Sequence, residues 1–156
     1  MRELSLTDEL TGLANRRGFL VRAGEVLTTA RRHGWPAVLA FVDVDRLKEI
    51  NDRFGHRRGD AVIREVAAVL ASSARESDIV ARWGGDEFVV LLPDTDDEHT
   101  VRSRLVAGAQ RDVGVELGVS IGTLVVVPED DRSLDELLDE ADRRMYADKR
   151  RHAPLT

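Results

Sequence analysis

The sequence lacks cysteine altogether, has few aromatic residues, and has no apolar run of the ~20 residues that a membrane helix needs. Without cysteine the chain can form neither disulfides nor thiolate metal sites, which is compatible with a reducing compartment. The first residues, Met1–Asp8, do not contain the apolar core of a signal peptide. We therefore expect a cytoplasmic domain that makes no membrane contact in this chain.

Lysine is also scarce. Of the 23 basic residues 21 are Arg, and Lys48 and Lys149 are the two lysines. The net charge of −6 argues against a broad nucleic-acid surface, because such a surface carries a basic excess. A nucleotide substrate stays compatible with this charge, since a divalent cation can join carboxylates to phosphates. Composition leaves open whether the two lysines are solvated side chains or have a specific role.

The chain has 156 residues, of which 42% are hydrophobic, and neither a linker nor an internal repeat divides it, so we expect one domain over residues 1–156. Periodicity and capping residues predict these elements, given in chain order: a helix capped by Thr7 or Asp8 that includes Phe19–Leu27, a buried strand Ala37–Val44, helices Arg46–Arg53 and Asp60–Ser73, strands Ile79–Trp83 and Phe88–Leu92, a helix Asp96–Asp112, strand material within Val115–Val127 with bends or bulges at Gly118 and Gly122, and a last helix capped by Ser133. Helices that alternate with a few strands indicate a layered α/β or α+β domain, with a split βαβ sheet as its form.

Two aspartates end the buried strand. Asp43 and Asp45 are two residues apart, so strand alternation would point both side chains to the same side. They are candidates for a metal site at the strand end. Alternatively, one carboxylate caps the next helix and the other is solvated.

A second acidic pair follows two glycines. Gly84 and Gly85 separate the predicted strands of a β-hairpin, and Asp86 and Glu87 come directly after them. Glycines let a ligand approach the backbone closely, although the pair alone also fits a solvated turn. If this hairpin lies beside the strand that ends at Asp43, the carboxylates form an oxygen-rich site suited to Mg²⁺. Such a site supports metal-assisted attack of a hydroxyl on phosphorus.

Between these segments lies a polar stretch from Asn51 to Asp60. Asn51 can donate and accept hydrogen bonds and Asp60 accepts them, so together they could recognise a guanine edge. Helix capping is the alternative for both, and it is strong for Asp60, which opens a predicted helix. We interpret His56, near the turn, as structural.

These residues together resemble the GGDEF family of diguanylate cyclases. Gly84-Gly85-Asp86-Glu87-Phe88 is the sequence that names the family. Further matching blocks run through nearly the whole chain in the family's order: Asp8 to Arg17, Asp43 to Asp52, Gly55-His56, Gly59-Asp60, Val119 to Gly122, and Ala141-Asp142 through Met145-Tyr146 to Lys149.

The resemblance implies an α+β fold, an α/β sandwich whose central, mostly antiparallel sheet is flanked by helices, similar to nucleotide-cyclase and polymerase palm domains. It implies that Asp43, Asp86 and the carbonyl of Val44 hold Mg²⁺, with Mn²⁺ as an alternative. Asp86 would also help to deprotonate the 3′-hydroxyl, and Glu87 would be a further ligand. Lys48 matches a lysine that meets the triphosphate and is counted with the catalytic residues.

For the substrate, the resemblance assigns the guanine to Asn51 and Asp60 and a second phosphate contact to Lys149. Arg46 and Leu47 differ from the usual family residues, but these positions are expected to contact phosphate through their backbone. The segment after Lys149 departs further from the family pattern, because Ala153 stands where the family has a basic residue. Arg150 or Arg151 is the candidate replacement.

Arg75-Glu76-Ser77-Asp78 resembles the family's inhibitory RxxD site, where the product binds. Arg102 or Arg104 on the following helix is expected to complete it, with Arg102 preferred. The alternative is that Arg75 and Asp78 form a surface ion pair without a ligand.

The implied reaction condenses two GTP molecules into cyclic di-GMP in a homodimer, with release of two pyrophosphates. The rival interpretation is a non-catalytic domain that serves as a receptor for GTP or cyclic di-GMP. The retained carboxylates and Lys48 favour the enzyme, whereas the altered tail favours the receptor.

Overall fold

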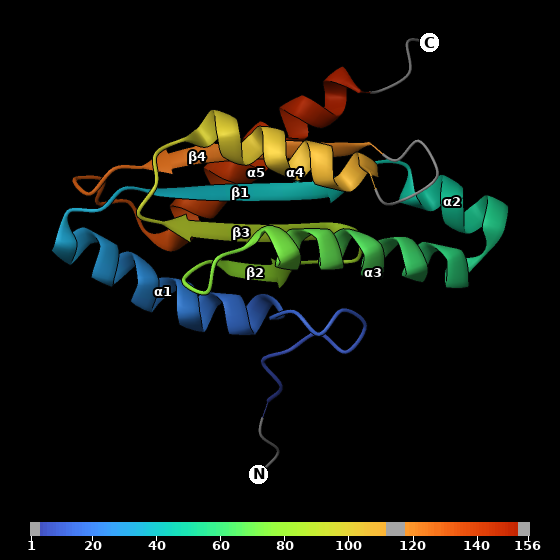
Figure 1. Cartoon of the computed structure of the whole chain (residues 1–156), viewed down its shortest axis with the longest axis horizontal. Helices are drawn as coiled ribbons and strands as arrows, with labels where there is room; N and C mark the ends of the chain where they lie inside the picture. Colours follow the sequence, from blue (N-terminus) through green and yellow to red (C-terminus); the bar gives the residue numbers. More distant parts are fainter. Residues whose placement is uncertain (1–3, 112–117, 153–156) are drawn as a thin grey trace.

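A four-stranded antiparallel sheet forms the centre of the domain (Figure 1). The computed structural model describes residues 4–111 and 118–152. The strands are β1 (Ala37–Val44), β2 (Ile79–Arg82), β3 (Glu87–Pro93) and β4 (Val119–Val126), in the order β2-β3-β1-β4. Both neighbours of β1 are antiparallel to it, and β2 is antiparallel to β3. Thus β1 and β2 run in the same direction with β3 between them, which confirms the predicted split βαβ arrangement.

Helices cover both faces of this sheet. Every residue of β1 is buried, because alternate side chains enter two separate cores. Val38, Ala40 and Val42 pack toward α2 (Leu47–Phe54), α3 (His56–Ser73) and α4 (Glu98–Arg111). Leu39 and Phe41 pack toward α1 (Arg16–His33) and α5 (Leu134–Arg151). Because alternate residues of β1 face the same side, Asp43 lies on the same face of the sheet as Leu39 and Phe41, toward α1 and α5. In the described ranges, no helix has the length and apolar character needed to cross a membrane.

The start of α1 differs from the prediction. Asn15 caps this helix, and its Oδ1 accepts a hydrogen bond from the backbone N–H of Gly18 at 2.8 Å. The carboxylate of Asp8 instead accepts bonds from the backbone N–H and hydroxyl of Thr11 within a preceding turn. Asp8 and Asn15 are both good capping residues, and the one adjacent to the helix takes this role.

The start of α3 was also predicted wrongly. This helix begins at His56, directly after Gly55, which has a φ of 89°. Asp60 is therefore its fifth residue and does not cap it, so this alternative role for Asp60 is excluded. A single glycine in the left-handed region suffices to separate α2 from α3.

Gly122 does not form the predicted bend or bulge. It pairs regularly with Phe41 in the middle of β4. A side chain at Gly122 would overlap the backbone of α5 at Ala141 and Met145, so the glycine permits close packing of helix on sheet. The part of the predicted element over residues 115–117 lies outside the described residues, as does residue 112 of the predicted fourth helix.

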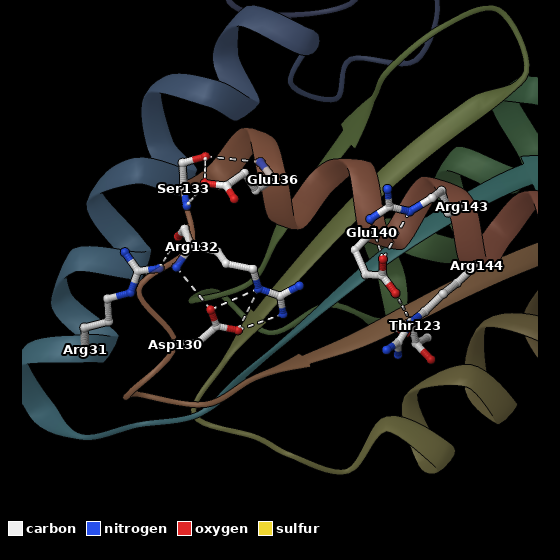
Figure 2. A network of polar contacts seen from close by, with 9 residues as sticks. All are labelled: Arg31, Thr123, Asp130, Arg132, Ser133, Glu136, Glu140, Arg143 and Arg144. Atoms are coloured by element: carbon white, nitrogen blue, oxygen red, sulfur yellow. Dashed lines mark hydrogen bonds and ion pairs between the residues drawn. The ribbon is translucent and has the colours of Figure 1, made fainter.

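Polar contacts hold the beginning of α5 against α1 and its second half against β4 (Figure 2). Ser133 caps the helix as predicted and forms a capping box with Glu136. Before the cap, Arg31 of α1 donates to the carbonyl of Arg132 at 2.8 Å. Further along, Arg144 donates to the carbonyl of Thr123 in β4 at 2.8 Å. These contacts set the direction in which α5 crosses the sheet toward the end of β1.

Candidate functional site

Three carboxylates gather where β1 ends and β3 begins. Asp43, Asp86 and Glu87 each contribute an oxygen, and these three atoms lie within 4.8 Å of one another. The sheet register causes this, because Asp43 pairs with Glu87 and the N–H of Val44 donates to the carbonyl of Asp86 at 2.9 Å. The predicted condition, a hairpin adjacent to the strand that ends at Asp43, is therefore met.

Asp43 is the most enclosed member of this carboxylate cluster. Its side chain is 4% exposed, and burial together with the charge of Asp86 raises its pKa to about 7. Lys149 opposes this shift, with its Nζ 3.2 Å from Asp43 Oδ2. The pKa of Glu87 is raised as well, by burial and by the charges of Asp142 and Asp86. The site thus concentrates negative charge that its own residues only partly balance.

The donor set of this cluster fits a divalent cation. The buried Oδ1 of Asp43 has no hydrogen-bond partner among the described residues, although buried polar atoms are normally paired. Carboxylate oxygens from two strands are the ligands that hard cations such as Mg²⁺ prefer. A bound cation would satisfy this oxygen and neutralise the repulsion among Asp43, Asp86 and Glu87.

Asp45 does not join the cluster, contrary to the strand-alternation argument. Strand β1 ends at Val44, so the period-2 rule does not extend to residue 45. The Asp45 carboxylate instead accepts the hydroxyl of Ser120 at 2.6 Å and lies 3.1 Å from His152 Nδ1. Asp45 therefore connects β1 to β4 and to the end of α5.

Arg82 holds the Gly84-Gly85 turn beside the carboxylate cluster in place through hydrogen bonds. Its guanidinium donates to the carbonyls of Gly84 at 3.2 Å and Gly85 at 2.9 Å, and it pairs with Asp8 at 3.3 Å. Our sequence reasoning missed this role, although an arginine within an otherwise apolar strand was a signal. A side chain added at Gly85 would meet no atom of the described residues within 4 Å, so the outer face of the turn is open to a ligand.

The two predicted guanine-reading residues come from α2 and α3. Asn51 lies in the second half of α2, and its buried Oδ1 has no hydrogen-bond partner within the described ranges. Gly59 packs directly against this oxygen, so the neighbouring residue Asp60 is brought close to Asn51. Asp60 is exposed, and neither residue caps a helix. The arrangement leaves an amide and a carboxylate available for a polar ligand.

The start of α2 has an unusual backbone. Arg46 precedes the helix with a φ of 61°, which is uncommon for a residue with a side chain. Arg46 also makes no side-chain capping bond to the described first turn of α2, so the N–H groups there remain available to an anion. Leu47 packs partly into the core, whereas Lys48 is exposed. In Figure 1 this helix start lies at the same end of the sheet as the end of β1.

The predicted inhibitory pair lies at the opposite end of the sheet. Arg75 donates to the carbonyl of Pro93 at 2.7 Å, and Pro93 pairs with Ala37 at the far end of β1. The Asp78 side chain is 1% exposed and accepts from both the backbone N–H and the guanidinium of Arg75. In this conformation Asp78 orients Arg75 and does not face a ligand, whereas the Arg75 side chain is 54% exposed.

Arg102, the preferred third member of that site, does not lie with Arg75. Its guanidinium donates to the carbonyl of Ile121 at 2.8 Å and pairs with buried Asp148 at 2.6 Å. Ile121 pairs with Val42, five positions along β1 from Ala37. Helix periodicity alone could not reveal this contact between α4 and α5. The other candidate, Arg104, lies close enough to Asp97 to contribute to the lowered pKa of that carboxyl.

The architecture and this site define the class of the domain: an α+β sheet domain with a carboxylate cluster at the end of its central strand. The family model described as "Diguanylate cyclase, GGDEF domain" matches residues 5–154. The chain therefore belongs to the GGDEF domain family. The family is thus confirmed, as is the α+β fold with helices flanking an antiparallel sheet.

Named relatives agree with this assignment. The chain is 35% identical to diguanylate cyclase DgcP of Pseudomonas aeruginosa over 96% of its own length and 23% of the relative. It is 38% identical to response regulator PleD of Caulobacter vibrioides over 94% of its length and 34% of the relative. It thus spans about a quarter to a third of these proteins. The GGDEF domain of DgcB from Caulobacter crescentus, solved with c-di-GMP, has a TM-score of 0.83 at 32% identity, covering 96% of this chain and 93% of that one.

Proposed function

We propose that the domain is a diguanylate cyclase, which condenses two GTP molecules into cyclic di-GMP and releases two pyrophosphates. The observation that carries the proposal is the cluster of Asp43, Asp86 and Glu87, with a buried Asp43 oxygen that has no hydrogen-bond partner in the described part of the chain. Lys149 adjoins it at 3.2 Å from Asp43, as a phosphate-binding cation would.

The guanine of GTP is bound by Asn51 and Asp60 in this proposal. A carboxylate can accept from guanine N1–H and its amino group, and the amide of Asn51 can add a further bond. The triphosphate then extends toward the start of α2, where the backbone of Arg46 and Leu47 offers N–H groups and the exposed Lys48 offers a charge. Lys149 approaches from the other side. Arg150 or Arg151 stays the proposed replacement for the cation missing at Ala153, which lies outside the described residues.

Asp43, Asp86 and the carbonyl of Val44 would hold Mg²⁺, with Mn²⁺ as the alternative, and Glu87 would be a further ligand. The cation supplies charge neutralisation at the α-phosphate and favours ionisation of the attacking hydroxyl. Asp86 accepts the proton of the 3′-hydroxyl, whose oxygen forms a bond to the α-phosphorus of the second GTP. The bond between the α-phosphorus and the oxygen bridging to the β-phosphate breaks, and pyrophosphate leaves.

One domain binds one GTP, so the reaction needs two domains that face each other as a homodimer. Each 3′-hydroxyl attacks the α-phosphate held by the partner, and two such attacks close the ring. The facing arrangement provides the proximity that makes the attack efficient. The cytoplasmic location expected from the sequence stays part of this proposal.

Product inhibition through Arg75 is also proposed. The exposed guanidinium of Arg75 is a planar fork suited to phosphate or to the Hoogsteen edge of guanine. Beside this segment, Arg22, Trp35 and Glu76 help to line a cavity of about 360 Å³. Because the site and the carboxylates lie at opposite ends of the sheet, a ligand there would act without competing with GTP.

The test is incubation of the purified domain with GTP and Mg²⁺, followed by mass spectrometry for cyclic di-GMP. Asp86→Ala serves as the matched variant, because Asp86 lies in a surface turn and supports no core. The proposal expects product from the wild type and none from Asp86→Ala. Tight GTP binding without product in either protein would favour the receptor interpretation.

A further inference from the structure

The residue that follows α5, His152, connects the end of this helix to two strands. Its Nδ1 lies 3.1 Å from Asp45 Oδ2 and 3.2 Å from Ser120 Oγ. Asp45 directly follows the last residue of β1, and Ser120 is the second residue of β4. One imidazole thus joins α5, β1 and β4 at the end of the sheet that carries the carboxylate cluster.

The hydrogen-bond directions in this contact can be assigned. Ser120 is fully buried, and its hydroxyl donates its single proton to Asp45 Oδ1 at 2.6 Å. Its oxygen can therefore only accept from the histidine, and the Asp45 carboxylate can also only accept. It follows that Nδ1 of His152 carries the hydrogen. Asp45 is a fixed anchor for His152, because the backbone N–H of Asp45 donates to the carbonyl of Gly118 at 2.9 Å.

This anchor holds the last turn of α5, where Lys149 lies. The backbone N–H of His152 donates to the carbonyl of Lys149 at 3.1 Å. Helix ends fray unless something holds them, and His152 ends this helix in a right-handed conformation with a φ of −90° and not with a left-handed glycine. Asp148 connects this turn to β4 by accepting from the N–H of Ile121 at 2.9 Å, and the imidazole contact adds a second connection at the end of the helix. Lys149, three residues earlier, is thereby kept with its Nζ 3.2 Å from Asp43.

We propose that His152 is a positioning residue that holds Lys149 in place for substrate phosphate, by anchoring the last turn of α5 to Asp45 and Ser120. The inference rests on the proposed function in that Lys149 is taken to meet GTP. His152 itself touches neither substrate nor metal in this account. Its loss therefore acts on GTP binding mainly through Lys149, which is the cation of this turn that lies beside the carboxylate cluster.

The experiment compares three substitutions at this position. His152→Ala removes the donor, and the KM for GTP should rise about five- to tenfold, as for one lost charge-assisted contact, with kcat changed less than about twofold. His152→Asn should restore the wild-type KM, since its amide nitrogen can occupy the place of Nδ1. His152→Gln places its amide near Nε2 and should behave as His152→Ala. His33→Ala is the matched control, because His33 stacks on Trp35 away from the carboxylate cluster.

The decisive comparison repeats His152→Ala in a Lys149→Ala background. There the effect of the second substitution on KM should be much smaller than in the wild type, because the main residue through which His152 acts is absent. An undiminished effect in that background would overturn the proposal, as would an unchanged KM in His152→Ala alone. Measuring Kd for a non-hydrolysable GTP analogue gives the same comparison without turnover. Cyclic di-GMP production tests the cyclase proposal, whereas the Kd comparison tests the positioning role. Either proposal can therefore fail while the other holds.

Discussion

Gly59 packs so closely against Asn51 that a methyl group at position 59 would overlap the Asn51 side-chain oxygen. The glycine thus fixes the amide that we assign to the guanine. Gly59→Ala should displace this amide and weaken GTP binding about tenfold or more, as expected when a buried polar contact is lost. Calorimetry with a non-hydrolysable GTP analogue measures the change.

Gly24→Ala is the matched control for that experiment, because a side chain at position 24 of α1 meets no atom within 4 Å in the described part of the chain. It should bind the analogue normally and gain ~0.5–1 kcal/mol of stability, since alanine favours a helix over glycine. If Gly59→Ala binds the analogue as well as Gly24→Ala does, Asn51 does not read the base.

The raised pKa of Asp43 predicts a dependence of stability on pH. The folded protein holds this proton up to about pH 7, whereas an unfolded aspartate releases it near 4. Between these values the folded state binds more protons, so the Asp43 contribution destabilises the fold progressively as pH rises. Above about pH 7 this loss is complete in the absence of metal.

Thermal unfolding in EDTA tests this dependence, with Asp43→Asn as the comparison. The stability gain of Asp43→Asn over the wild type should be small near pH 4 and largest above pH 7. Carboxyls with lowered pKa values, such as Asp148, have the opposite effect on the pH dependence of stability. This effect is the same in both proteins, so it cancels in the difference between their stabilities. Mg²⁺ should raise the midpoint of the wild type at pH 7.5. A difference that does not vary with pH would contradict the assignment.

Arg82 should be needed for turnover because it holds the glycine turn that carries Asp86. Arg82→Lys keeps the charge but cannot reproduce the bonds to Gly84, Gly85 and Asp8. We expect kcat to fall about tenfold or more, since a small displacement of reacting groups is costly. Arg143→Ala, which removes an arginine that is 72% exposed, should leave kcat unchanged. Initial rates of pyrophosphate release measure both, and equal rates would exclude a positioning role for Arg82.

Arg75 and Asp78 should behave differently when each is replaced. Arg75→Ala should relieve non-competitive inhibition by cyclic di-GMP and preserve GTP turnover. Asp78→Ala should instead destabilise the domain by ~1–3 kcal/mol, because it leaves the N–H of Arg75 without its buried acceptor. Rates at several GTP and product concentrations, with unfolding curves, separate the two effects. Inhibition that is competitive, or unchanged in Arg75→Ala, would leave the pair as a structural ion pair.

The sequence predicted the features that depend on short-range patterns. The apolar run Ala37–Val44 was predicted as a buried strand with its observed bounds, because a strand covered on both faces has no polar alternation. The two glycines predicted the hairpin, and the resemblance of the flanking blocks predicted the family. Ser133 was identified as a cap because its partner Glu136 lies three residues away.

The remaining features depend on contacts between distant segments. Strand periodicity placed the Asp45 carboxylate beside that of Asp43. In the structure the Asp45 carboxylate instead contacts Ser120 and His152, which lie far along the chain. Arg102 was assigned to the inhibitory site as an arginine on the helix that follows, whereas its partner Asp148 comes from another helix. Such contacts follow from how helices lie on the sheet, which local pattern does not encode.

The most direct test of the cyclase account is the stoichiometry of the reaction. The domain is incubated with GTP and Mg²⁺ at high protein concentration, and pyrophosphate and cyclic di-GMP are quantified from the same samples. The account predicts two pyrophosphates for each cyclic di-GMP, no product from ATP, and a specific rate that rises with protein concentration as domains pair. Pyrophosphate release without cyclic dinucleotide, or bound GTP that stays intact, would contradict it.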